Sequence, residues 1–297
     1  MAMETAIVGQ GPFTYEVDNR WGRGEGGVAA FGLVSGIACD SQDRVYVFNR
    51  LPNPAVLVFD RAGRLLTRWG EGQFRHPHGI WISPSDELYL TDRETHLVSR
   101  WTFEGKLLQQ WGTPNRPGAP GEPFNEPTHA VVTPDGDLYV SDGYGQSRVH
   151  RFAADGRLLT SWGEPGSGPG QFNLPHDVWV DSRDRVLVCD RPNERIQHFD
   201  RDGRYLGEWR DLRVPQQVFE RYGVLYLAEG GPRVTLMTLD GDTLAQWGSH
   251  GDRPEQFTDS PHGIWVDSRG DIYVSEVTSH DKLQKFIRTG GSAKSQA

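Results

Sequence analysis

A tryptophan recurs at regular intervals along the chain, and glycine follows it in five of the six units. The successive gaps between these tryptophans are 48, 42, 51, 47 and 38 residues. They are Trp21, Trp69, Trp111, Trp162, Trp209 and Trp247. A repeat of this length is the size of one four-stranded propeller blade. The period therefore predicts stacked repeats around an axis and excludes a single irregular core.

Each unit contains four short strand-like segments. The segment before the tryptophan reads RLLTRWG, KLLQQWG or RLLTSWG, and the next unit then opens with GIWIS, AVVTP, DVWVD or GIWVD. A second strand follows as LYLTD, LYVSD, VLVCD or IYVSE, with turns such as Asp135-Gly136 and Asp155-Gly156. Gly and Asp provide the backbone geometry of tight hairpins. We therefore predict an all-β, six-bladed β-propeller whose blades bury their faces against one another.

The two ends of the sequence predict how the ring closes. Residues 14–22 read TYEVDNRWG and match the last strand of a unit, whereas the final unit, residues 263–286, has only three strands. The N-terminal strand is therefore expected to complete the C-terminal blade, which removes an open sheet edge. We expect one domain over residues 1–290 and a disordered polar tail at residues 291–297.

Charge and cysteine content limit the partners and the compartment. The formal net charge of −9 argues against nucleic acid as a partner. Cys39 and Cys189 lie far apart within apolar runs, so we expect buried free thiols and no disulfide. Residues 1–10 lack the basic and apolar regions of a signal peptide, and no run approaches about 20 apolar residues. These features predict a soluble, cytoplasmic protein with no membrane partner.

The first strand of each blade should run beside the central axis, and its entrance carries a patterned residue. Aligning the six strands on their apolar cores gives Ser35, His78, Thr128, His176, Gln216 and His262. Histidine occupies alternate blades, so three imidazoles should converge from directions about 120° apart. This arrangement is that of a three-histidine metal site with an open position, with the intervening polar residues orienting ligands or water. The alternative is that the histidines only supply hydrogen-bonding groups to a wet channel.

The second strand of each blade ends on the same face as these entrances. Acidic residues recur there, and we expect them to accept hydrogen bonds from local backbone amides. They are Asp92, Asp142, Asp190, Glu229 and Glu276. Neighbouring positions place Arg50, Arg93, Arg191 and Tyr144 around the channel mouth. Arginine suits carboxylate recognition and a phenol can carry a proton, although arginines at strand ends are also commonly solvated.

The other seven histidines share no register. His76 and His129 lie close enough in sequence to the channel entrances to contact a substrate. We expect most of the remainder to lie on the surface or in loops. They are His96, His150, His198, His250 and His280.

The repeat units resemble NHL repeats, and residues 32–286 resemble the catalytic core of peptidyl-α-hydroxyglycine α-amidating lyase. The likeness is carried by HPHGIWISPSDELYLTD, PTHAVVTPDGDLYVSDGYGQSRV, GQFNLPHDVWV and SPHGIWVDSRGDIYVSE. The resemblance implies a zinc site, a tyrosine base and two arginines that bind substrate or stabilise charge. These roles fall on His78, His176 and His262, on Tyr144, and on Arg50 and Arg191. That family cleaves a carbinolamide into an amide and an aldehyde acid.

The sequence also departs from the family pattern. Ile37 and Ile80 could offer the backbone carbonyls of the family's structural calcium, but Gly263 replaces its aspartate, which argues against calcium. Ser260 replaces a methionine beside the last histidine, so the substrate pocket should differ. Arg93 has no family counterpart and adds positive charge, which favours a small anionic substrate.

Two further positions depart from the family. Gly145 and Leu187 stand where the family has disulfide cysteines, in agreement with a cytoplasmic setting.

The leading functional hypothesis is a metal-dependent lyase, or a hydrolase, that cleaves a C–N bond in a small hydroxylated, anionic amide. The metal would be zinc or another transition metal, since imidazole suits such ions. Substrate contacts are expected from Arg93, His129, Ser260 and His76. A non-catalytic NHL propeller that binds a protein partner is the main alternative. A lactonase or phosphotriesterase with pore calcium is a third, although calcium prefers carboxylate and amide oxygens. The sequence leaves the oligomeric state open.

Overall fold

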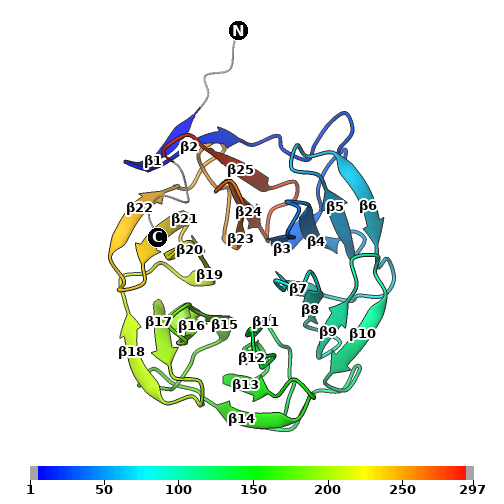
Figure 1. Cartoon of the computed structure of the whole chain (residues 1–297), viewed down its shortest axis with the longest axis vertical. Coiled ribbons are helices and arrows are strands. Elements are labelled where there is room, and N and C mark those ends of the chain that lie inside the picture. Colours follow the sequence, from blue (N-terminus) through cyan, green and yellow to red (C-terminus); the bar gives the residue numbers. More distant parts are fainter. Residues whose placement is uncertain (1–5, 292–297) are drawn as a thin grey trace.

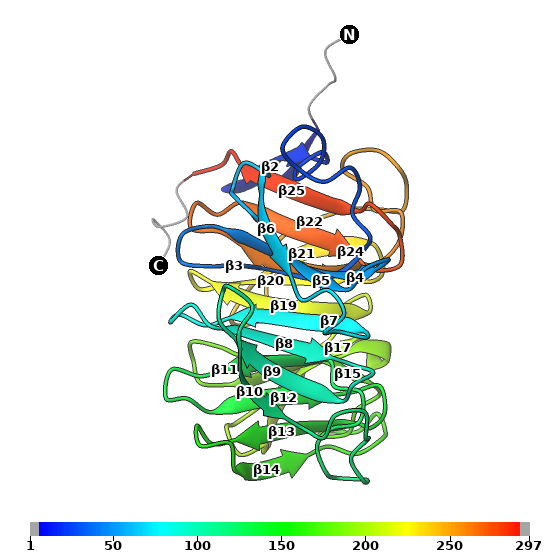
Figure 2. The same ribbon diagram turned by 90° about the vertical axis from the view of Figure 1, so that its right-hand side faces the viewer.

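The computed structural model describes residues 6–291 and shows six antiparallel sheets arranged around a central axis (Figure 1). Seen from the side, the ring is flattened along its axis, with β2 and β25 at one edge (Figure 2). The predicted all-β, six-bladed propeller is confirmed. Among the described residues, no helix is long and apolar enough to cross a membrane. The predicted tail at residues 291–297 lies outside the described residues except for its first residue.

Each blade runs from an inner strand at the axis to an outer strand at the rim. Blade 1 holds β3 (Leu33–Cys39), β4 (Val45–Leu51), β5 (Ala55–Phe59) and β6 (Leu65–Trp69). Blade 2 holds β7 (Pro77–Ile82), β8 (Leu88–Asp92), β9 (Leu97–Trp101) and β10 (Leu107–Trp111). Blade 3 holds β11 (His129–Val132), β12 (Leu138–Asp142), β13 (Arg148–Phe152) and β14 (Leu158–Trp162).

The second half of the ring repeats this order. Blade 4 holds β15 (Pro175–Val180), β16 (Val186–Asp190), β17 (Arg195–Phe199) and β18 (Tyr205–Trp209), with a 3₁₀ turn at Arg191–Asn193. Blade 5 holds β19 (Pro215–Arg221), β20 (Val224–Glu229), β21 (Arg233–Thr238) and β22 (Thr243–Trp247). Blade 6 holds β23 (Pro261–Val266), β24 (Ile272–Glu276), β25 (Leu283–Arg288), β2 (Phe13–Asp18) and β1 (Ile7–Gln10).

The ring closes through the N-terminal segment, as predicted. Strand β2 pairs antiparallel with β25, with Val17 opposite Phe286. Strand β1 was not predicted from the sequence; it adds a fifth strand to blade 6 by pairing with β2. The Gln10 side chain donates a hydrogen bond to the Leu244 carbonyl of β22 at 2.8 Å, so β1 also contacts blade 5. The N-terminal segment therefore joins two blades.

The glycine that follows five of the six repeated tryptophans has a specific structural role. These glycines have positive φ, a region that L residues with a side chain rarely adopt. A phenylalanine ring from the following loop also lies within 3.1 Å of where a Cβ atom would stand. The pairs are Gly22 with Phe31, Gly70 with Phe74, Gly112 with Phe124, Gly163 with Phe172, and Gly248 with Phe257. Each pair fixes the path of the loop that leads into the next blade.

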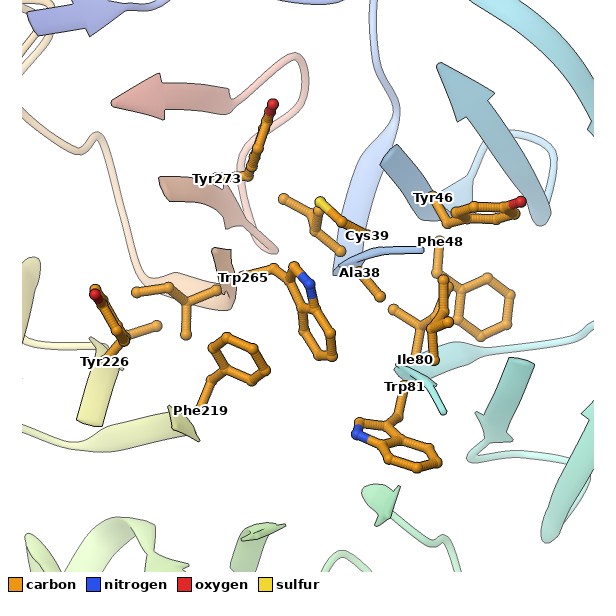
Figure 3. Close-up of a cluster of buried hydrophobic side chains, with 14 of the residues drawn as sticks. Ala38, Cys39, Tyr46, Phe48, Ile80, Trp81, Phe219, Tyr226, Trp265 and Tyr273 are labelled. Atoms are coloured by element: carbon orange, nitrogen blue, oxygen red, sulfur yellow. The ribbon is translucent and has the colours of Figure 1, made fainter. Parts of the chain in front are cut away.

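Buried side chains change in character along the axis. In four blades, a large aromatic residue follows the channel-entrance residue by three positions along the inner strand. These residues are Trp81 on β7, Trp179 on β15, Phe219 on β19 and Trp265 on β23. The rings of Phe219 and Trp265 stack with centroids 4.1 Å apart. Figure 3 shows Trp81, Phe219 and Trp265 projecting toward the centre of the ring. We call the end of the channel that these aromatic side chains occupy the lower face. The opposite end, where the inner strands begin, is the upper face.

Both cysteines are free and buried, as predicted. Cys39 lies at the end of β3 and Cys189 lies within β16. Burial raises the pKa of both thiols, so neither is a reactive thiolate near neutral pH.

We predict that Gly163→Ala destabilises the fold more than Gly170→Ala in the same loop. Both glycines have positive φ, but only a Cβ at Gly163 would meet a ring, that of Phe172, whereas nothing lies within 4 Å at Gly170. Backbone strain alone should cost about 1–2 kcal/mol, and overpacking should add about 1–3 kcal/mol at Gly163. Chemical denaturation of both variants measures the difference. Equal losses would contradict a packing role for this glycine.

Candidate metal centre

One cavity on the axis brings together the six entrance residues identified from the sequence. Ser35, His78, Thr128, His176, Gln216 and His262 all line it, one from each blade. They meet because each lies at or near the start of the innermost strand of its blade.

The three histidines of alternate blades form a compact cluster. The potential ligand atoms of His78, His176 and His262 all lie within 4.8 Å of one another. Their ring centroids are 4.8–5.0 Å apart. All three side chains are buried, with exposed fractions of 2%, 2% and 5%. The cluster is therefore a shielded group of nitrogen ligands that could hold a metal ion.

A hydrogen bond to the next blade orients each imidazole. Nδ1 of His78 lies 2.7 Å from the Thr128 carbonyl oxygen, and Nδ1 of His176 lies 2.7 Å from that of Gln216. Nδ1 of His262 lies 2.6 Å from the Ser35 carbonyl oxygen. A carbonyl only accepts, so Nδ1 must carry the hydrogen and Nε2 keeps its lone pair. The intervening residues thus orient the histidines through backbone carbonyls, a detail that the sequence did not reveal.

The electrostatic surroundings keep these imidazoles neutral. Burial lowers the pKa of His78 well below its usual value, and the other two histidines lower it further. Burial and then the Arg191 charge lower the pKa of His176. Burial and then the Arg50 charge lower the pKa of His262 to about 3. Neutral imidazole is the form that binds metals.

The donor set fits a transition metal. Three neutral imidazole nitrogens suit zinc, copper, iron or nickel, whereas calcium takes oxygen ligands. The Ile80 carbonyl, one of the oxygens considered for calcium, instead lies 3.3 Å from His129 Nε2.

Tyr144 lies beside the histidine cluster on the upper face. It follows β12 by two residues, and its hydroxyl oxygen lies 3.2 Å from His78 Nε2 and 3.3 Å from His176 Nε2. Its ring meets that of His78 edge to face, with the centroids 5.3 Å apart. The phenol oxygen is therefore the acid–base group nearest to the imidazole nitrogens among the residues that the sequence singled out.

Two arginines flank Tyr144. Arg50 donates from Nε to the Pro77 carbonyl at 3.0 Å, while its Nη2 is buried with no hydrogen-bond partner among the described residues. Burial lowers the pKa of Arg50 to about 10. Arg191 Nη1 lies 3.4 Å from the Tyr144 hydroxyl. Arg50 thus offers a buried N–H donor on a cation, without a partner among the described residues. It is not one of the solvated arginines that are common at strand ends.

Arg93 and His76 are partly engaged by acidic neighbours. Arg93 Nε lies 2.7 Å from Glu126 Oε2, and its Cζ lies 4.0 Å above the Tyr144 ring centroid. His76 Nδ1 lies 3.1 Å from Glu94 Oε1, and burial lowers the pKa of this histidine. The positive charge expected from Arg93 is therefore paired with a carboxylate at the mouth.

His129 lies deeper than the mouth. It is one residue further along its strand than Thr128, and its Nδ1 lies 2.7 Å from Asp177 Oδ1. Burial by itself would lower its pKa, but the Asp177 carboxylate and the hydrogen bonds together raise it. His129 and Asp177 thus form a close buried contact next to the histidine cluster.

Two other histidines are exceptions to the expectation that most lie on the surface or in loops. His150 on β13 is fully buried, with Nδ1 2.7 Å from Ser161 Oγ and Nε2 3.2 Å from Asp142 Oδ2. His198 on β17 is buried, and its ring centroid lies 4.3 Å from that of Trp209. Polar or aromatic neighbours make burial of these rings tolerable. Their position within strand segments, rather than in turns, was the signal that could have indicated it.

The recurrent acidic residues have the structural role that was predicted. Each accepts a hydrogen bond from a backbone N–H in the loop that leads into the first strand of its blade. The pairs are Asp92 with Arg75 and His76, Asp142 with Asn125, Asp190 with Asn173, Glu229 with Arg213, and Glu276 with Asp259. In blade 1, Asn49 Oδ1 accepts from Gly32 at 3.0 Å. These bonds hold the loops around the mouth.

We predict that the metal-free protein loses stability as the pH falls from 6.5 to 5.5. In the unfolded chain, His78, His176 and His262 gain protons as the pH falls through about 6.5. In the folded protein they stay neutral over this range, because burial lowers their pKa values. Each of the three therefore lowers the unfolding free energy by up to about 1.4 kcal/mol per pH unit. The raised pKa of His129 opposes this loss mainly at the upper end of the range and above it. Burial also lowers the pKa values of His76 and His198, which adds to the loss.

Urea unfolding in chelator across this pH range measures the slope. The His176→Gln variant should lose one of the three contributions. A flat profile in the parent protein would contradict burial of neutral histidines.

The solved structures with the same fold include several enzymes. A gluconolactonase from Xanthomonas campestris aligns over 97% of this chain and 96% of its own, with a TM-score of 0.69 and 14% identity. A streptogramin B lyase aligns over 88% of this chain and 97% of its own, with a TM-score of 0.64 and 13% identity. At these identities the likeness concerns the fold alone.

Sequence comparisons identify nearer relatives. A family model described as a 6-bladed beta-propeller matches residues 126–221. The peptidylglycine alpha-amidating monooxygenase of Rattus norvegicus is 30% identical over 87% of this chain, which spans 30% of that protein. The peptidyl-alpha-hydroxyglycine alpha-amidating lyase 1 of Drosophila melanogaster is 25% identical over 89% of this chain and 53% of its own length.

A third relative matches along most of its length. NHL repeat-containing protein 3 of Homo sapiens is 33% identical over 84% of this chain and 78% of its own length. The chain therefore belongs to the family of six-bladed NHL-repeat propellers that includes NHL repeat-containing protein 3, and it is related to the α-amidating lyases.

Proposed function

We propose that this protein is a metal-dependent lyase that cleaves the C–N bond of a small hydroxylated, anionic amide. One observation carries the proposal: three buried imidazoles cluster with their Nδ1 atoms bonded to carbonyls, and the Nε2 atoms of His78 and His176 lie beside the Tyr144 hydroxyl. The names of the α-amidating relatives support a lyase acting on an α-hydroxylated amide. The buried, unpaired Nη2 of Arg50 supports an anionic substrate.

The reaction would convert a carbinolamide into an amide and an aldehyde. A transition metal held by His78, His176 and His262 would supply Lewis-acid polarisation that makes a hydroxyl group more acidic. The substrate hydroxyl loses its proton, its C–O bond becomes a carbonyl, and the C–N bond breaks. The departing nitrogen gains one proton, so the reaction needs no further reagent.

Two side chains would share the proton transfer and the charge. The Tyr144 hydroxyl oxygen can accept the hydroxyl proton and deliver a proton to the departing nitrogen. Arg50 Nη2 can bind the carboxylate of the substrate. Arg191 Nη1, 3.4 Å from the phenol oxygen, can stabilise negative charge that develops there.

We propose that Arg93 positions Tyr144 instead of binding the substrate directly. Glu126 Oε2 pairs with Arg93 Nε, and the Glu126 carbonyl oxygen lies 3.4 Å from the Tyr144 backbone nitrogen. The Arg93 guanidinium lies over the phenol ring. Together these contacts hold the ring from its face and from its backbone.

We predict that zinc-reconstituted protein holds about one ion per chain and cleaves N-benzoyl-α-hydroxyglycine. His176→Ala should lose both the metal and the activity, because it removes one of three ligands. Tyr144→Phe should keep the metal but lose at least about 100-fold in kcat, since general acid–base catalysis typically contributes that much. Elemental analysis and a product assay measure both quantities.

Two results would count against the lyase. Parent protein that retains no metal after reconstitution would favour a non-catalytic propeller that binds a protein partner. Metal retained with no cleavage of any hydroxylated amide would favour another reaction, such as hydrolysis.

We predict that Arg93→Met lowers kcat about fivefold with little change in KM, since a stacked cation contributes on the order of 1 kcal/mol. Glu126→Gln should act in the same direction, and the double variant should be less than additive because the two side chains form one unit. Steady-state kinetics measures the split. A rise in KM at constant kcat would instead place Arg93 in direct contact with the substrate.

A further inference from the structure

Gln216 differs from the other two residues that alternate with the histidines at the channel entrance. Ser35 Oγ donates to the Phe48 carbonyl of its own blade at 3.1 Å. Thr128 Oγ1 bonds within its own blade, to Ser141, and to the Pro175 carbonyl. The Gln216 amide bonds instead to two residues of the mouth, Ser260 and Arg191. Its polar end is therefore part of the mouth.

The contacts of Gln216 fix the orientation of its amide. Nε2 donates to Ser260 Oγ at 3.0 Å, and Oε1 lies 3.4 Å from Arg191 Nη1. A guanidinium can only donate, so the atom that faces Arg191 must be the oxygen. Contacts within residues 6–291 use one N–H and one lone pair of this amide, which can make about four hydrogen bonds. The side chain is only 6% exposed and lines the cavity with the three histidines.

The backbone around this pair leaves space for it. A Cβ atom on Gly230 would lie 2.8 Å from both Gln216 Nε2 and Ser260 Oγ. The Gly230 N–H donates to the Val214 carbonyl at 2.8 Å, so the loop cannot easily retreat. Glycine at this position therefore admits the Gln216–Ser260 pair to the edge of the cavity.

Gln216 also connects the histidine cluster to the acid–base group. Its backbone carbonyl orients His176, as described above. Arg191 Nη1 lies 3.4 Å from the Gln216 side-chain oxygen and 3.4 Å from the Tyr144 hydroxyl. A group bound to the Gln216 amide would therefore lie next to the groups that are proposed to break the C–N bond.

We propose that Gln216 and Ser260 form a subsite for a terminal –CO–NH₂ group on the leaving side of the substrate. One edge of a primary amide offers a carbonyl oxygen and an N–H side by side, which matches the acceptor and donor of the glutamine amide. A secondary trans amide presents these groups in opposite directions and can use only one of them. An N-carbamoyl, or ureido, group has the required edge.

The inference rests on the proposed lyase for its chemistry but not for its binding. With an N-carbamoyl-α-hydroxy acid, the C–N bond to the hydroxylated carbon would break and the hydroxyl would become the carbonyl of an aldehyde acid. The departing nitrogen would gain a proton, and the leaving group would be urea. No oxidant, reductant or second substrate is required.

The test compares two ligands that cannot react, because they lack the hydroxyl group. N-carbamoylglycine and N-acetylglycine carry the same carboxylate but differ in the terminal –NH₂. Isothermal titration calorimetry on zinc-loaded protein should show the carbamoyl compound binding about tenfold tighter, as expected for one added hydrogen bond in a buried site. Gln216→Leu should remove this preference and leave the metal content unchanged, since the backbone carbonyl on His176 is retained.

Gln246→Leu is the matched control, because Gln246 lies on the outer strand β22 and bonds Thr235 away from the channel. It should keep the preference of the parent protein. Equal affinity for the two ligands, no binding of either, or a preference that survives in Gln216→Leu would each overturn the subsite.

A second assay separates the subsite from the proposed lyase. The α-hydroxy forms of the two ligands are offered to the zinc-loaded parent protein and cleavage is measured. A binding preference without cleavage of either compound would support the subsite and overturn the lyase. Cleavage of both at equal kcat/KM, with no binding preference, would support the lyase and overturn the subsite.

Discussion

The candidate centre depends on one interaction that occurs three times, the hydrogen bond from a histidine Nδ1 to the carbonyl of the next blade. Each bond fixes the tautomer and the direction of one imidazole, and it also ties two blades together at the axis. The third bond joins His262 to Ser35, which are 227 residues apart in sequence. It forms where the inner strands of blades 6 and 1, β23 and β3, lie side by side. The centre is therefore complete only in the closed ring.

The channel is divided by the chemistry of its lining. The upper end carries imidazoles, a phenol and guanidinium groups, and large aromatic side chains occupy the lower end. Between them lies the buried pair of His129 and Asp177. Low exposure keeps the upper imidazoles neutral, while carboxylates at the mouth hold loops and offset arginine charge. Burial therefore keeps the imidazoles in the form that binds metals, and it leaves Nη2 of Arg50 without a hydrogen-bond partner among residues 6–291.

Much of this arrangement could be predicted from residue spacing, and the failures have specific causes. The tryptophan period gave six blades, and a shared register brought His78, His176 and His262 to one cavity. Strand β1 was missed because a short edge strand carries little periodicity of its own. Burial of His150 was not predicted because a polar residue suggests exposure, but Ser161 and Asp142 satisfy its two nitrogens. Such partners come from other strands and are not visible along the chain.

The sequence by itself determined the number of blades, the way the ring closes and which blades carry histidine, because each follows from a repeat that can be counted. Only the tertiary structure decided which nitrogen of each histidine is free, since that depends on a carbonyl contributed by another blade. It also decided that Arg93 is stacked on Tyr144 and that Gln216 faces the mouth. Side-chain direction and pairing depend on neighbours brought together by the ring, and spacing along one strand does not specify them.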